Sequence, residues 1–99
     1  MKGFTQAGKD KGDLEKELEN LIVSIKTTIR MYSASIEDLT EEELRCDLEE
    51  YQRQYKEQVK PIVDRAFLTR NEKLMKMAKE YENLHLKLIE LIKQRLDTF

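Results

Sequence analysis

The sequence predicts an all-α protein, built as an antiparallel helical hairpin or three-helix bundle with coiled-coil-like packing. Charged residues make up 38% and hydrophobic residues 39% of the 99 residues, with only three Gly and one Pro. That composition is typical of helical and coiled-coil proteins. Apolar residues also recur at spacings of three and four from Leu14 onward, which is the period of one helix face. A chain of this length is expected to form one domain, here residues 13–99.

The N-terminal segment differs from the rest of the chain. Residues 1–12, MKGFTQAGKDKG, hold all three glycines and show no helical periodicity, so we expect a flexible tail. The first helix is predicted over residues 13–35, with Asp13 as its N-cap and Glu15 in its first turn. One apolar stripe follows along this helix: Leu14, Leu18, Leu21, Ile25, Ile29 and Tyr32.

The clearest helix start is the stretch LTEEEL, Leu39 to Leu44. As N-cap, Thr40 can accept a hydrogen bond from the amide of Glu43, whose carboxylate can reach back to the amide of Thr40. Leu39 and Leu44 occupy the two positions of a hydrophobic staple. We therefore predict that the second helix starts at Glu41 and spans residues 41–68, and we interpret the three glutamates as part of a helix start, not as an acidic site.

Two apolar patterns follow in the second half of the chain. Pro61 interrupts the first of them, and a proline inside a helix causes a kink or a break. The second pattern has strict heptad spacing, as in a coiled coil or bundle, and predicts a helix over residues 70–98. The first pattern is Leu44, Leu48, Tyr51, Tyr55, Val59, Ile62, Val63, Ala66 and Phe67, and the second is Leu74, Met77, Tyr81, Leu84, Leu88 and Leu91.

The connection near Thr69 leaves two architectures open. Thr69 and Glu72 have the spacing of another capping box, and the matched segment lengths favour a three-helix bundle. The stretch FLTRNEKL, however, contains no glycine and no following proline, so a tight reversal is only weakly indicated. The balance leans to one continuous helix over residues 41–97, bent at Pro61 and roughly 85 Å long at ~1.5 Å per residue.

Groups that carry chemistry are scarce. Glu82 and His85 have the Glu-x-x-His spacing of di-iron carboxylate bundles, but such a site needs a second Glu-x-x-His, and the chain has one histidine. We expect His85 instead to flank the apolar seam of Leu84 and Leu88 with its ring partly exposed. Cys46 stands between Arg45 and Asp47, whose charges roughly cancel, so nothing favours a reactive thiolate. We therefore expect no catalytic, cofactor-binding or metal-ligating residues, no cofactor, and a protein that is not an enzyme.

Charge and cysteine usage suggest a compartment and one alternative function. The net charge of −2 creates no general attraction to nucleic acid or to an acidic membrane. A single cysteine suits a reducing compartment, and no apolar run approaches the length of a membrane span. We expect an intracellular protein, of cytoplasm or nucleus, without membrane contact. The basic stretch Arg53–Lys76 leaves a nucleic-acid-associated protein as an alternative, although acids interrupt it.

The C-terminal helix provides the one positive sign of a function. The stretch LHLKLIELI, Leu84 to Ile92, is apolar on more than one side, and such a helix is usually covered on several sides. The prediction is a non-enzymatic protein–protein interaction module, a small subunit or adaptor that self-associates or completes a helical bundle with a partner. A small helical chaperone or immunity-type inhibitor is a second alternative. The expected partner interface is Leu84, Leu88, Ile89, Leu91, Ile92 and Leu96.

Overall fold

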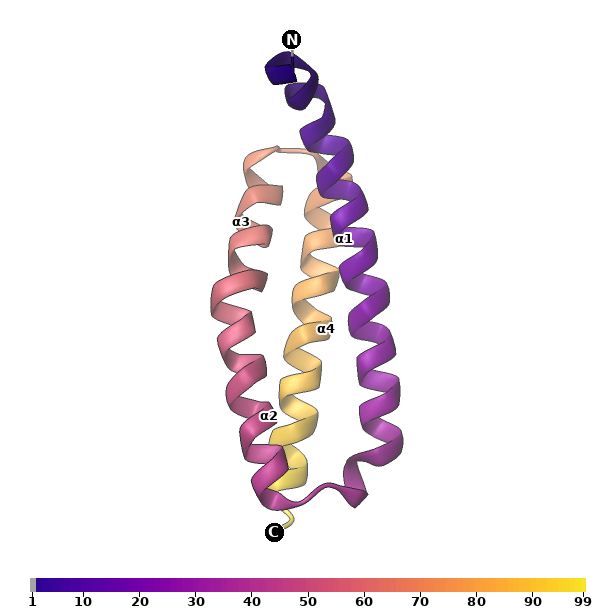
Figure 1. The fold of residues 1–99 in the computed structure, drawn as a ribbon, viewed down its shortest axis with the longest axis vertical. Helices are drawn as coiled ribbons and strands as arrows, with labels where there is room; N and C mark the ends of the chain where they lie inside the picture. Colours follow the sequence, from indigo (N-terminus) through magenta and orange to yellow (C-terminus); the bar gives the residue numbers. More distant parts are fainter. Residues whose placement is uncertain (1) are drawn as a thin grey trace.

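The protein is an all-α three-helix bundle, which confirms the predicted fold class. The computed structural model describes the backbone of residues 2–99 and the side chains of residues 12–99. Two of its three rods are the single helices α1 and α4, and the third is a continuous helical rod of α2, η2 and α3 (Figure 1). The bounds are α1 Lys2–Ser35, η1 Ile36–Asp38, α2 Glu41–Gln54, η2 Tyr55–Val59, α3 Lys60–Leu68 and α4 Glu72–Leu96.

Helix α4 is the central element of the bundle. It packs along α1 on one side and along α2 and α3 on the other, whereas α1 and the α2–α3 rod approach each other less closely (Figure 1). A helix with two neighbours needs two apolar stripes, and α4 has them. The buried residues of α4 are Leu74, Ala78, Tyr81, His85, Leu88, Ile89 and Ile92.

The reversal between α3 and α4 corrects the preference for one continuous helix. The chain turns at Thr69 and Arg70, and Arg70 adopts the left-handed conformation with φ 55°. The side chain of Asn71 caps α4 by accepting a hydrogen bond from the amide of Leu74 at 3.1 Å. The expected capping box of Thr69 with Glu72 is therefore wrong. A non-glycine residue in this conformation costs roughly 1–3 kcal/mol, and burial of a whole face of α4 exceeds that cost.

Pro61 bends the second rod without reversing it. The turn before it, η2, is a π-helix in which the amide of Lys60 donates to the carbonyl of Tyr55, five residues back. Pro61 has no amide hydrogen, and its ring conflicts with the carbonyl of Glu57 in a regular α-helix. The wider π turn moves the proline ring away from that carbonyl. As a result α3 continues directly from α2, and the kink expected at Pro61 takes the form of a π turn.

The two predicted helix starts in the first half of the chain have different outcomes. Thr40 caps α2 as expected, because the amide of Glu43 donates to its hydroxyl at 3.1 Å and its own amide donates to the Glu43 carboxylate at 2.9 Å. By contrast, α1 begins at Lys2, so Asp13 lies inside α1 and is not its N-cap. The three glycines of the chain all lie in this first part of α1. Each glycine inside a helix costs only about 1 kcal/mol relative to alanine, so glycines make a helix harder to predict but do not prevent it. Flexibility of residues 1–12 stays a prediction.

Candidate functional site

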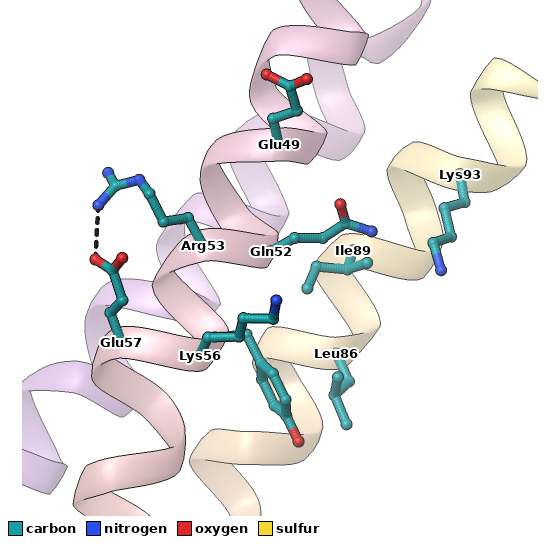
Figure 2. Close-up of a pocket in the computed structure, with 9 residues that line it drawn as sticks. Glu49, Gln52, Arg53, Lys56, Glu57, Leu86, Ile89 and Lys93 are labelled. Atoms are coloured by element: carbon teal, nitrogen blue, oxygen red, sulfur yellow. Dashed lines mark hydrogen bonds and ion pairs between the residues drawn. The ribbon is translucent and has the colours of Figure 1, made fainter.

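A groove with a volume of about 700 Å³ lies between the α2–η2 part of the second rod and α4. In Figure 2, Gln52 reaches across it towards Ile89 on α4, while Arg53 of α2 and Glu57 of η2 pair on the side of their rod that faces away from α4. Five of the nine residues that line the groove are charged: Glu49, Arg53, Lys56, Glu57 and Lys93. Tyr55 also lines the groove, and its hydroxyl donates to the carboxylate of Glu82 on α4.

A buried histidine lies at the centre of the bundle. His85 is 1% exposed, and the rings of Tyr51, Tyr55 and Tyr81 lie 6.0, 6.2 and 6.3 Å from its ring. Its Nε2 lies 2.8 Å from the carbonyl oxygen of Tyr51. A carbonyl can only accept, so Nε2 carries the proton. Burial lowers the pKa of His85, which keeps the ring neutral. The expectation that His85 flanks the apolar seam with its ring partly exposed is therefore wrong.

Two tyrosine–carboxylate pairs extend this polar interior between the rods. Tyr32 of α1 donates to Asp47 of α2 at 2.6 Å, and burial followed by this bond raises the pKa of Tyr32 strongly. Tyr55 donates to Glu82 of α4 at 2.7 Å. Hydrogen bonds from Lys79 and then Tyr55 lower the pKa of Glu82. Each pair joins two different rods, so these groups fix how the rods lie against each other.

The Glu82–His85 pair is engaged in this structural network. Glu82 accepts from Lys79 and Tyr55, and His85 donates to the backbone of α2. No cluster of three ligating side chains occurs among residues 12–99. Cys46 is exposed and free. Glu82 and His85 therefore both serve to join α4 to the second rod.

The residues expected to form a partner interface lie mostly inside the chain's own bundle. Leu88 and Ile92 are fully buried and Ile89 is 7% exposed. The other three, Leu84, Leu91 and Leu96, are partly buried against the same core. Leu84 to Ile92 is apolar on several sides because two rods of the same molecule cover it. Its apolar width therefore does not require a second protein.

The outward side of α1 carries a surface that the sequence reading overlooked. Val23 and Met31 are 64% and 65% exposed, and Thr27 lies between them, half-exposed. Asn20 and Ala34 extend the same side of the helix by one turn in each direction, and both are exposed. We call these five residues the outer α1 face. They cover about 21 Å of helix without a charged side chain.

The outward sides of the other rods are charged at nearly every turn. Exposed residues of α2 include Glu42, Arg45, Glu49 and Arg53, and those of α4 include Lys76, Lys79, Glu80, Lys87 and Glu90. The low charge of the outward side of α1 is visible in the sequence, because residues 20–36 contain only two charged residues, Lys26 and Arg30. In a chain with 38% charged residues, such a segment is unusual for an exposed helix.

The basic stretch Arg53–Lys76 is divided between two antiparallel rods. Three of its bases form ion pairs: Arg53 with Glu50 and Glu57, Arg65 with Glu17, and Lys73 with Glu15. Each pair neutralises charge that a nucleic-acid phosphate would need. None of the helices within residues 2–99 has the length and apolar content needed to cross a bilayer.

Comparisons with known protein families, with characterised proteins and with solved structures found no match to this chain. A functional conclusion therefore depends on the residues and geometry described above.

Proposed function

We propose that this chain is a non-enzymatic protein–protein interaction module, a small helical subunit or adaptor that binds through the outer α1 face. The observation that carries the proposal is the absence of charge along that face, from Asn20 to Ala34, beside two well-exposed apolar side chains, Val23 and Met31.

The physical reason is the cost of removing charges from water. The centre of a protein interface is depleted of charged residues, because each buried charge must lose its hydration. Single exposed apolar residues are ordinary on any surface. A stripe without charge along four turns of an exposed helix is less usual, because solubility favours charged residues at the surface. Thr27 and Ala34 are also small, so another backbone can approach α1 closely.

This proposal keeps the predicted class of function and changes its location. The seam Leu84–Ile92 was expected to bind a partner, but α1 and the α2–α3 rod already cover it. The nucleic-acid alternative has less support, because ion pairs occupy three of the bases in Arg53–Lys76. The described residues carry no feature that distinguishes a chaperone or an inhibitor from other binding proteins.

The proposal can be tested in the cells that express the chain. A photo-crosslinking amino acid is placed at Met31, and in a matched control at Leu86, which is 41% exposed in the groove between α2 and α4. We expect a discrete protein adduct from position 31 and none from position 86. Absence of any adduct from position 31, with the tagged chain folded and expressed, contradicts the proposed function.

A further inference from the structure

We infer that the partner of the outer α1 face is a second copy of this chain, bound antiparallel with a two-fold axis at Thr27. The inference rests on the proposed function and specifies its partner. It follows from two features, the spacing of the outer α1 face and the charges that flank this face on either side.

The spacing of the outer α1 face is the same in both directions. From Asn20 to Ala34 the residues follow at intervals of 3, 4, 4 and 3, centred on Thr27. In a two-fold dimer the same patch must match itself after rotation. An antiparallel pair centred on Thr27 therefore places Val23 against Met31 of the second copy, and Asn20 against its Ala34. Larger side chains meet smaller ones, and the two threonines allow close approach at the axis.

Two charges that flank the outer α1 face are complementary in the same alignment: Lys16, within α1, and Asp38, in η1 just beyond its end. Lys16 lies eleven residues before Thr27 and Asp38 eleven residues after it, so the pairing brings Lys16 of one copy near Asp38 of the other. Both side chains are exposed, and neither forms an ion pair within the described part of the chain. A parallel pairing would instead place Lys16 against Lys16 and Asp38 against Asp38.

The two basic residues beside the face, Lys26 and Arg30, do not oppose this arrangement. Lys26 is already directed towards α4, where it pairs with Glu80 at 3.4 Å. Arg30 is exposed and in this register lies opposite Ser24, an uncharged residue. The seam of about 21 Å is short, so we expect a weak, reversible dimer of the kind that small interfaces form.

Charge exchange tests the pairing of Lys16 with Asp38. Sedimentation velocity of the purified chain over a range of concentrations gives the dimer dissociation constant. We expect Lys16→Glu and Asp38→Lys each to raise it roughly three- to tenfold, because two exposed ion pairs become two repulsions. The double variant should restore it to within about twofold. A double variant as weak as the single ones contradicts the antiparallel register.

Cysteine crosslinking tests the position of the axis. In a Cys46→Ser background, which removes the exposed native thiol, Thr27→Cys should form a disulfide-linked dimer under mild oxidation. Val23→Cys alone should not, because its two copies lie roughly 12 Å apart along the helices, beyond the reach of a disulfide. A mixture of Val23→Cys and Met31→Cys chains should crosslink. Efficient Val23–Val23 crosslinks would overturn the antiparallel arrangement in favour of a parallel one.

The failure of this inference is distinguishable from the failure of the proposed function. A purified chain that stays monomeric at all concentrations, without a Thr27→Cys dimer, overturns the second copy as partner. If the photo-crosslinker at Met31 then gives an adduct of a different mass from the chain's own dimer, the proposed function stands with another partner. If it gives none, both fail.

Discussion

The outer α1 face and the groove between α2 and α4 both expose apolar side chains, but their surroundings differ. In the groove, Leu86 is 41% exposed among five charged residues. On α1, Val23 and Met31 are more exposed and have no charged neighbour within the face. A partner that covered the groove would have to remove several charges from water, whereas one confined to the outer α1 face would not. We therefore expect the charge around exposed apolar side chains to indicate a binding surface better than the depth of a groove does.

The largest expected effect is a loss of stability at Leu88, which the sequence predicted to bind a partner but which lies in the core. Leu88→Ala should lower the free energy of unfolding by about 2–5 kcal/mol, because it leaves a cavity between three rods. Leu86→Ala, two residues away in the groove, should cost about 1 kcal/mol or less, because much of its side chain is already hydrated. Denaturant unfolding measures both. A stable Leu88→Ala protein that loses only association would return the binding surface to α4.

A smaller effect is expected at the start of α2, which belongs to neither surface. Thr40→Ala removes a hydrogen bond of the capping box and should cost about 0.5–2 kcal/mol of stability. Ser33→Ala, at an exposed position of α1 without such a bond, serves as the control. Association should be unchanged in both variants once the loss of folded protein is taken into account. If fully folded Thr40→Ala protein no longer formed the dimer, the connection between η1 and α2 would have to take part in binding.

The smallest effect is a pH dependence from His85. Its pKa in the folded protein lies below the ordinary value of about 6.5, because burial disfavours the charged ring. Below that pH the unfolded chain binds a proton that the folded chain does not. The stability is therefore complete above about pH 6.5 and falls towards the folded pKa, by at most about 1.4 kcal/mol per pH unit.

Unfolding measured between pH 7 and 5 tests this slope. His85→Phe should be less stable at neutral pH, since it loses the bond to the Tyr51 carbonyl, but its stability should change less over this range. An equal slope in the wild type and the variant would show that other groups cause the pH dependence.

Local features of this fold could be predicted from the sequence, whereas features that depend on three rods together could not. The capping box at Thr40 and the stripe from Leu14 to Tyr32 are local patterns, and the structure contains both. The reversal at Arg70 was underestimated, because an arginine in the left-handed conformation gives no signal of the kind that glycine gives. His85 seemed peripheral because the heptad through Leu84 and Leu88 describes only one of the two stripes that α4 buries.

The outer α1 face was missed for a related reason. Apolar periodicity finds the side of a helix that faces the core, and Val23, Thr27 and Met31 lie on the opposite side. The useful signal was the low charge of residues 20–36, which periodicity does not measure. The apolar width of Leu84–Ile92 correctly indicated burial on several sides, but the sequence cannot tell a covering helix of the same chain from one of a partner.

The most direct test of the comparison between the two surfaces uses two single variants, each with one glutamate in one of the surfaces. Sedimentation velocity of each purified variant gives its dimer dissociation constant. Met31→Glu places a charge on the outer α1 face, and Leu86→Glu places one in the groove between α2 and α4. We predict that Met31→Glu weakens dimer formation at least tenfold, while Leu86→Glu leaves it within about twofold of the wild type, with both variants folded by circular dichroism. The reverse result, a dimer lost in Leu86→Glu and retained in Met31→Glu, would contradict the account.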